Sequence, residues 1–300
     1  MKNIKILLTI MLTVILMLTG CSSGKDTSKE EFKPVAKKDY LSVSFINVGK
    51  GDAFLISTPD GKNYMIDTGK KDKYPVIKQL LQEKGINKLD GILLSHGHKD
   101  HIGGVQYLLE DMKVDSIYVS ELDTVSYKKA NLEDLASKYN STLKKVKAGD
   151  EIILSESEIP VKAEVLGPIS LDSTEANNNS MVLKITYGDN SFLMMGDAQF
   201  LEEMDIFKSG TALDADVLKT GHHGKDDASS QGFLSAVNPK YAILTGNKEE
   251  DSNSLSNKII GRLQAMKTEI FVSEGDFLAV DFICDGKTIT PVKFSKIQAK

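Results

Sequence analysis

The sequence has little arginine, little cysteine and few long apolar runs, and each shortage excludes a class of protein. Arg262 is the only arginine among 37 basic residues, so bidentate guanidinium clamps on an anionic substrate are almost excluded. Such a substrate must be held by lysine, backbone amides or metal. The two cysteines, Cys21 and Cys284, cannot form a disulfide framework, and Cys284 follows Phe282 and Ile283 as expected of a core residue.

Long apolar runs are equally scarce. The only one, Ile6 to Leu18, is shorter than the roughly 20 residues of a spanning helix, which excludes a multi-pass membrane protein. The formal net charge of −5 argues against a basic surface that coats nucleic acid. Of the 300 residues, 41% are hydrophobic, which is enough for one large domain or two small ones.

The first 39 residues have the features of an export signal and a tether. Residues 1–20 carry Lys2 and Lys5 before the apolar run and end in small residues, as signal peptides do. The ending Leu18-Thr19-Gly20-Cys21 resembles the lipobox of bacterial lipoproteins, which implies lipidation of Cys21. Residues 21–39 are polar and predict a tether, and residues 40–300 the folded domain. We therefore expect a protein anchored to the cell membrane on its extracytoplasmic face.

The pattern of the domain predicts an α/β layered fold, because early strands in a meander give way to strands that alternate with helices. Pro59-Asp60-Gly61 predicts a hairpin turn between two early strands. The expected strands are 41–46, 53–58, 64–66, 89–94, 116–119, 161–166, 181–187, 192–195, 217–219, 241–244, 270–273 and 277–282. The expected helices are 76–84, 102–110, 132–139, 198–208 and 257–266.

All five histidines fall in two short clusters. His96, His98 and His101 share a seven-residue stretch with Asp100, directly after a predicted strand, and His222 and His223 are adjacent. Imidazole nitrogens together with a carboxylate are a ligand set for zinc or a related divalent ion. The first cluster therefore predicts a metal site on a strand-to-helix turn.

The stretch His96-Gly97-His98-Lys99-Asp100-His101 resembles the HxHxDH signature of the metallo-β-lactamase superfamily. The segments ending in Asp67-Thr68-Gly69, Met195-Gly196-Asp197 and Gly221-His222-His223-Gly224 are similar to other segments of that family, in order. Val48 to Ala53, Asn178-Asn179-Ser180 and Leu218 to Gly224 look most like the ComEC type, the hydrolase domain of competence DNA-uptake channels. This resemblance implies an αββα four-layer sandwich.

The resemblance also implies residue roles. His96 and His98 would bind a first metal, Asp100 and His101 a second, and Asp197 would bridge the two. His222 would complete the second site and His223 would face the substrate, although sequence alone leaves their exchange open. Asp67 would hold a ligand histidine through a hydrogen bond, with Asn179 and Ser180 as further supporting groups. Catalysis would fall to Asp100, Asp197 and His223.

The family's middle histidine is absent, since none lies between His101 and His222. The first metal site is therefore poorer in nitrogen, which makes manganese an alternative to the expected pair of zinc ions. A late His-Pro of the ComEC type is also missing from residues 251–255. Among lysines near the motifs, Lys225 is the best candidate to attract a phosphate, whereas Lys70, Lys71, Lys73 and Lys99 are expected to be solvated surface.

These residues predict a metal-dependent hydrolase that cleaves phosphodiesters with hydroxide generated on the metals. The expected substrate is extracellular nucleic acid or a phosphorylated envelope polymer. One alternative is hydrolysis of β-lactams or of other amides and esters, against which the missing middle histidine argues. The other is a metal-binding lipoprotein without turnover, against which the intact HxHxDH motif argues.

Overall fold

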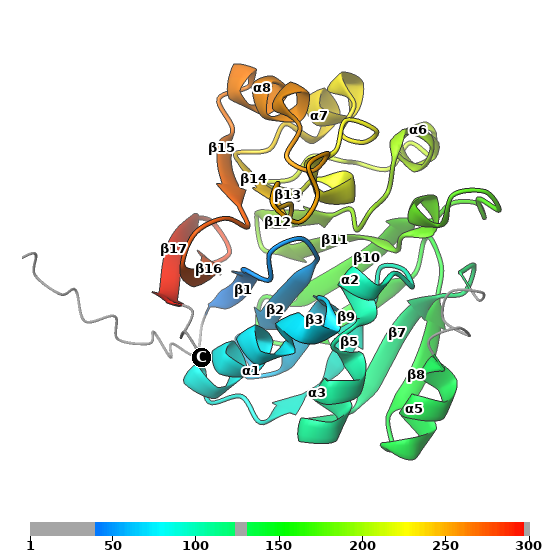
Figure 1. Ribbon diagram of the computed structural model, residues 1–300, viewed down its shortest axis with the longest axis vertical. Coiled ribbons are helices and arrows are strands. Elements are labelled where there is room, and N and C mark those ends of the chain that lie inside the picture. Colours follow the sequence, from blue (N-terminus) through cyan, green and yellow to red (C-terminus); the bar gives the residue numbers. More distant parts are fainter. Residues whose placement is uncertain (1–39, 124–130, 297–300) are drawn as a thin grey trace, which may run out of the picture. The chain divides into compact units, whose positions relative to one another are not determined.

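The computed structural model describes residues 40–123 and 131–296, and these residues form two large sheets with helices on both outer sides, and one small sheet (Figure 1). The predicted signal peptide, Cys21 and the tether lie outside the described residues. Within the described part, no helix combines the length and the apolar character needed to cross a membrane.

The first sheet has eight strands in the order β17-β16-β1-β2-β3-β5-β7-β8. Its strands from β1 to β3 form the expected meander, and its C-terminal hairpin pairs with β1, so that Val43 lies opposite Phe282. The strands are β1 (Leu41–Ile46), β2 (Ala53–Ser57), β3 (Asn63–Thr68), β5 (Gly91–Leu93), β7 (Ser116–Ser120), β8 (Thr142–Val146), β16 (Phe277–Cys284) and β17 (Ile289–Lys296).

The second sheet has seven strands in the order β15-β14-β13-β12-β11-β10-β9. Its members from β12 to β15 pair in parallel, so their carboxyl ends lie at one edge. The strands are β9 (Glu151–Ser155), β10 (Val161–Gly167), β11 (Val182–Tyr187), β12 (Asn190–Met194), β13 (Val217–Lys219), β14 (Tyr241–Leu244) and β15 (Glu269–Val272). A separate small sheet pairs β4 (Lys88–Leu89) with β6 (Lys113–Val114).

The inner faces of the two large sheets pack against each other. Because side chains alternate along a strand, Phe54 of β2 faces the inter-sheet core while its neighbour Leu55 faces the helices. Phe54 shares that inter-sheet core with Phe192 and Phe282. Both faces of the first sheet are therefore buried, which explains its nearly continuous apolar strands.

Helices cover the two outer faces. Ile77 and Leu80 of α1 pack with Leu55 on the first sheet, and Phe233 of α7 packs with Leu218 on the second. The first group is α1 (Tyr74–Glu83), α2 (Lys99–Ile102), α3 (Val105–Asp111) and α5 (Leu132–Lys138), and the second is α6 (Phe200–Lys208), α7 (Gln231–Val237) and α8 (Asn257–Ala265). The short 3-10 helices are η1 (Lys71–Lys73), η2 (Ala176–Asn179) and η3 (Gly221–Gly224). The predicted four-layer sandwich is confirmed.

Some elements differ from the sequence-based expectation. The predicted helix over 102–110 is two helices, α2 and α3, because the pair Gly103-Gly104 separates them. Gly104 packs so closely on Thr68 that a Cβ there would lie 2.4 Å from the Thr68 carbonyl oxygen. The strands β8, β9 and β17 and the helix α7 were not expected.

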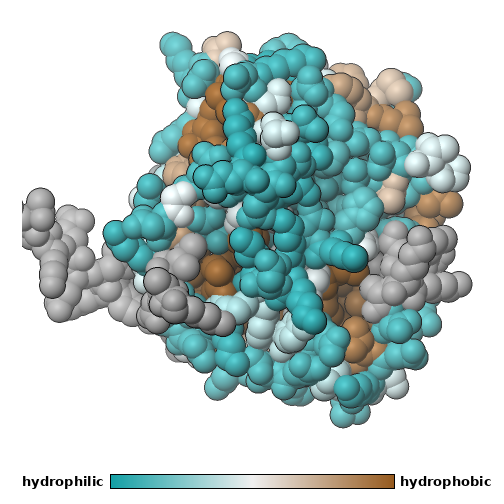
Figure 2. All heavy atoms as spheres, viewed as in Figure 1, coloured by the Kyte–Doolittle hydropathy of each residue, from teal (hydrophilic) through white to brown (hydrophobic). Residues whose placement is uncertain are grey.

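Helix α6 has an unusual distribution of side chains. Phe200, Leu201, Met204 and Phe207 are exposed, whereas Glu202 and Glu203 are buried. Figure 2 shows hydrophobic atoms at the edge of the molecule where α6 lies. The glutamates are buried because they accept backbone hydrogen bonds: Glu202 from Ile169 and Glu203 from Ser230.

Candidate metal centre

The predicted site residues converge where strands of both sheets end. Asp67 lies at the end of β3, and His96 follows β5 in the first sheet. In the second sheet, Asp197 follows β12 and His223 follows β13. The turn before Asp197 needs glycine, because Gly196 has φ +53° and a Cβ there would lie 2.7 Å from Ser95 Cβ. The site is therefore shared between the two sheets.

The first ligand set consists of His96, His98 and Asp197. Their ligand atoms all lie within 4.8 Å of one another. His96 Nε2 lies 2.9 Å from His98 Nδ1 and 3.8 Å from Asp197 Oδ2. His96 is buried and His98 is exposed, so this set opens toward solvent.

The second set surrounds the same carboxylate. His101 Nε2 and His223 Nε2 each lie 3.2 Å from Asp197 Oδ2. His223 Nε2 also lies 3.2 Å from Asp100 Oδ2, on the side of the site where α2 begins. Asp197 thus lies between the two sets, where the resemblance expected a bridging residue.

The two adjacent histidines face different surroundings. His223 is fully buried among the candidate ligands, whereas His222 points away and its Nδ1 lies 2.9 Å from Asp227 Oδ2. Both residues have positive φ, 43° and 56°, and this left-handed turn separates their side chains. Of the two histidines whose roles the sequence left open, the geometry places His223, and not His222, beside the second group of candidate ligands.

Asp67 lies behind the second set. Its Oδ2 is 2.8 Å from His101 Nδ1, and its carboxylate also accepts hydrogen bonds from the Ser95 backbone amide and hydroxyl. A carboxylate on Nδ1 leaves the Nε2 lone pair of His101 directed at the metal position, as in many metal sites. The structure thus places Asp67 where the resemblance expected it.

The Asn179 and Ser180 predictions have different outcomes. Ser180 Oγ accepts a hydrogen bond from the Asp197 backbone amide at 3.0 Å and lies 3.4 Å from His96 Nδ1. The amide of Asn179 instead bonds both the backbone N–H and the carbonyl of Asp172, at 2.8 Å each. Ser180 therefore supports the ligands, while Asn179 closes a loop.

Two further residues, Asp52 and Lys219, had no assigned role in the sequence. Lys219 is fully buried, and its Nζ lies 2.5 Å from Asp52 Oδ2 and 3.6 Å from Asp197 Oδ1. Asp52 Oδ1 lies 3.5 Å from His223 Nδ1, on the opposite side of the ring from the metal position. The pair therefore orients the ligands from behind. Asp52 follows the first strand in Gly49-Lys50-Gly51-Asp52, a segment noted only for its family resemblance.

The charges of the site indicate a need for cations. Buried polar atoms without a hydrogen-bond partner include His101 Nε2, His223 Nε2 and Asp197 Oδ1 among the described residues. Such atoms are costly unless they bind something, and a divalent ion satisfies imidazole nitrogen and carboxylate oxygen together. The donor set therefore fits a pair of divalent ions.

The pKa shifts have the same cause. Burial alone would lower the pKa of His223, yet the nearby carboxylates, Asp197 first, raise this pKa to about 9. Although burial acts in the opposite direction, His101 and His223 hold the pKa of Asp197 well below its ordinary range. Burial and the adjacent His101 lower the pKa of His96, which leaves it neutral and ready to bind metal. Although burial opposes it, Asp197, Asp52 and Asp67 also raise the pKa of His101 well above its ordinary value. A bound ion would replace the protons on His101 and His223.

Comparison with known proteins identifies the same superfamily that the sequence motifs resemble. The family described as the Metallo-beta-lactamase superfamily matches residues 46–245. "ComE operon protein 3" of Bacillus subtilis (strain 168) is 28% identical over 239 residues, which cover 74% of this chain and 30% of that protein. "Competence protein ComA" of Neisseria gonorrhoeae is 28% identical over 233 residues, 77% of this chain and 30% of that one. The chain thus spans less than a third of each relative.

Among solved structures, CmlA, a diiron beta-hydroxylase from Streptomyces venezuelae, is similar with a TM-score of 0.55 and 11% identity. The similarity covers 83% of this chain and 55% of that one, and it supports the fold alone. The family match includes His96, Asp197 and His223, and the competence-protein relatives agree with the expected ComEC type. The chain belongs to the metallo-β-lactamase superfamily.

Proposed function

We propose that this member of a superfamily of metal-dependent hydrolases is a phosphodiesterase that cleaves nucleic acid. The observation that carries the proposal is the position of Asp197 between two ligand sets, which suits a pair of ions acting on one phosphate. The competence relatives support nucleic acid as the substrate, and an envelope phosphodiester polymer is the alternative.

Bound divalent ions would acidify water and neutralise charge on the phosphate oxygens. His96, His98 and Asp197 would hold the first ion, and Asp100, His101, His223 and Asp197 the second. We propose zinc for both, with manganese as the alternative, because the first set has only two imidazoles. The residues behind them, Asp67 and Lys219 among others, keep these ligands in place.

Two side chains near the ligands can act on the substrate itself. Lys50 Nζ contacts Asp100, so its positive charge lies beside the second set, where it would stabilise charge on a bound phosphate. His222 is paired through Nδ1 with the Asp227 carboxylate, so a protonated His222 ring would carry on Nε2 a proton to donate and would return to the neutral form with its remaining proton on Nδ1. We assign His222 the protonation of the leaving oxygen, the role first expected for His223.

The location of the enzyme belongs to the same proposal. A lipid on Cys21 and the tether 21–39 would hold the domain at the extracytoplasmic face of the cell membrane. Replacing Cys21→Ala should release the protein from the membrane fraction of cells expressing it. A variant that stays membrane-bound would contradict the anchor without affecting the proposed reaction.

The reaction is tested with the full chain, bis(p-nitrophenyl) phosphate and DNA, under added zinc or manganese. His98→Ala and Asp100→Asn should each reduce cleavage by at least 100-fold, because each removes one ligand. A β-lactam chromogen serves as the competing substrate. If it is hydrolysed orders of magnitude faster than either phosphodiester, the phosphodiesterase proposal is wrong.

The exchanged histidine roles have their own test. His223→Ala should lower the metal content measured by elemental analysis, because it removes a ligand. His222→Gln should retain both metals and lose about 10² to 10⁴ in kcat, the usual contribution of a general acid. The opposite pattern would restore the original assignment.

A further inference from the structure

Four lysines lie beside the metal centre, and three separate loops supply them. Lys50 precedes β2, Lys70 and Lys73 follow β3, and Lys225 follows His223-Gly224. Their side chains are 17 to 30% exposed, so they border the site without being fully buried. Lys50 contacts the candidate ligand Asp100, and Glu250, the partner of Lys70 and Lys73, lies against the neighbouring Gly49, so these lysines lie at the rim of the centre. We call these four residues the lysine rim.

Carboxylates from one loop form ion pairs with the other three lysines. Glu250 pairs with Lys70 and, at 3.1 Å, with Lys73. Asp251 pairs with Lys225 at 2.9 Å. Both acids belong to the β14–α8 connection, which continues to a backbone hydrogen bond of 3.2 Å from Leu255 to the His223 carbonyl. A chain of anionic groups therefore runs along the lysine rim.

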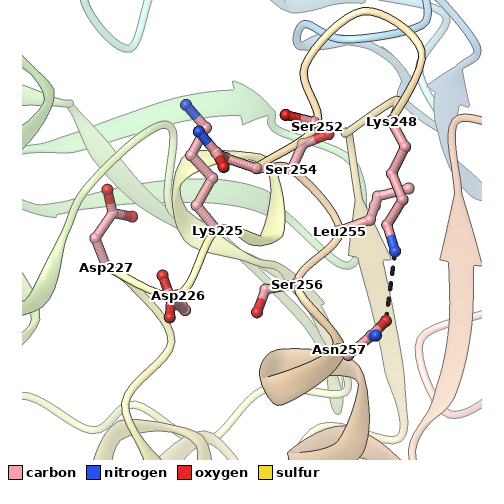
Figure 3. Close-up of a pocket in the computed structure, with 10 residues that line it drawn as sticks. Lys225, Asp226, Asp227, Lys248, Ser252, Ser254, Leu255, Ser256 and Asn257 are labelled. Carbon is pink, nitrogen blue, oxygen red and sulfur yellow. Dashed lines mark hydrogen bonds between the residues drawn. The ribbon is translucent and has the colours of Figure 1, made fainter.

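Space for a ligand is present beside Lys225. A polar pocket of about 480 Å³ is lined by Lys225, Lys248 and the segment 252–257, and on its other side by the carboxylates of Asp226 and Asp227. Figure 3 shows Lys225 facing the part of this segment that carries Ser252 and Ser254. Serine hydroxyls and lysine ammonium groups are suitable donors to phosphate oxygens.

We propose that the lysine rim binds the phosphates that flank the cleaved bond of a nucleic-acid strand, and that Glu250 and Asp251 occupy it until the strand displaces them. This inference rests on the proposed function and adds to it a multi-phosphate substrate. Exposed ion pairs contribute little net stability in water, so displacing these carboxylates costs little. Phosphates gain in exchange from the release of their counterions.

The alternative is that the ion pairs only hold the 249–251 loop in place. The two explanations differ in the direction in which two variants change the affinity for the strand. If the pairs only hold the loop, Glu250→Gln and the double variant Lys70→Gln/Lys73→Gln remove the same contacts and act in the same direction. If Glu250 competes with phosphate, the first strengthens strand binding and the second weakens it.

The test measures anisotropy of a fluorescein-labelled 12-mer oligothymidylate with the full chain in EDTA, which prevents cleavage. Lys70→Gln/Lys73→Gln should weaken binding about tenfold at 0.1 M salt. It should also reduce the slope of log K against log salt by about 1.4, since each lost phosphate contact contributes about 0.7 for a single strand. Glu250→Gln should tighten binding about two- to fivefold.

Matched controls separate the rim from overall charge. Glu249→Gln makes the same charge change next to Glu250, and the exposed Glu249 has no ion pair within the described residues. Lys162→Gln/Lys287→Gln removes two lysines near the β11–β12 turn at 188–189, at the other end of the sheets. Both controls should bind the 12-mer as the unsubstituted chain does.

A kinetic arm links binding to turnover of the metal-loaded enzyme. Lys70→Gln/Lys73→Gln should raise KM for the 12-mer relative to bis(p-nitrophenyl) phosphate, which has a single phosphate, and leave kcat for the 12-mer within a factor of two. Absence of all phosphodiester cleavage would refute the proposed function, while the anisotropy experiment would still decide this inference. The inference is overturned if Glu250→Gln and Glu249→Gln change the affinity for the 12-mer equally. It is also overturned if a glycerol-phosphate polymer binds to the protein and the 12-mer does not.

Discussion

At the scale of single residues, Asp67 determines how well the second ligand set can hold an ion. It has φ +53°, a conformation that asparagine also tolerates, so Asp67→Asn preserves the backbone while removing the charge on His101 Nδ1. We expect this variant to bind metal about 10- to 100-fold more weakly, measured by competition with a chromogenic chelator. Ser95→Ala, which keeps the carboxylate, should lose less, and equal affinities of Asp67→Asn and the parent would refute the positioning role.

How far sequence can identify site residues depends on the residue type. The five histidines are rare and clustered, so His96, His98 and His101 were found from the sequence. Asp52 and Lys219 are common residue types far apart in the chain, and only folding places them 2.5 Å apart. Which of His222 and His223 lies among the candidate ligands depends on the left-handed backbone at both residues, and the amino-acid sequence does not reveal that conformation.

At the scale of elements, helix α6 contains a titratable group that should make stability depend on pH. Burial raises the pKa of Glu202 to about 7, whereas in the unfolded chain it releases its proton near its ordinary value. The folded state therefore binds the extra proton between roughly pH 4.5 and 7, and stability falls as the pH rises through that range. Above it, the cost of the charge is on the order of 3 kcal/mol.

Glu202→Gln should remove this cost and keep the hydrogen bond from Ile169. We expect a Tm above that of the parent by several degrees at pH 8 and a difference near zero at pH 4.5, measured by thermal unfolding. The exposed Glu156→Gln is the control for loss of one negative charge. An equal Tm difference at both pH values would show that ionisation of Glu202 is not the cause.

Sequence patterns predicted the buried elements better than the peripheral ones. Strands such as β5 and β14 contain only hydrophobic residues and glycine, because both of their faces are covered. The strand β8 has mostly exposed and half-buried residues at the edge of its sheet, and β17 contains Pro291, so neither shows a clear strand pattern. In α6 the outward apolar face reverses the usual pattern, so its buried side could not be assigned.

At the scale of the whole molecule, metal should connect the two sheets. His96 and His101 belong to the first sheet's loops, and Asp197 and His223 to those of the second. Binding stabilises the folded state by about 2.7 kcal/mol at an ion concentration 100 times Kd. We expect EDTA to lower Tm by about 5 to 10 °C and added zinc or manganese to restore it, in differential scanning fluorimetry.

The control for this prediction is His222→Gln, which should respond to EDTA as the parent does, because His222 lies outside both ligand sets. His223→Ala should respond less, since it binds one ion more weakly. A Tm that EDTA leaves unchanged in the parent would mean that the ions contribute nothing to holding the sheets together.

The pairing of β1 with β16 sets the order in which the chain can fold. Residue 41 lies opposite residue 284, so β1 can gain this neighbour only after residues 42–283 have been made. A chain that emerges with its N-terminus first, from a ribosome or through an export pore, has β1 unpaired on that side and lacks Phe282 in the inter-sheet core until then. Contacts so distant in sequence form slowly and late. The topology therefore predicts that the first sheet is completed only after the hairpin of β16 and β17 is available to pair with β1.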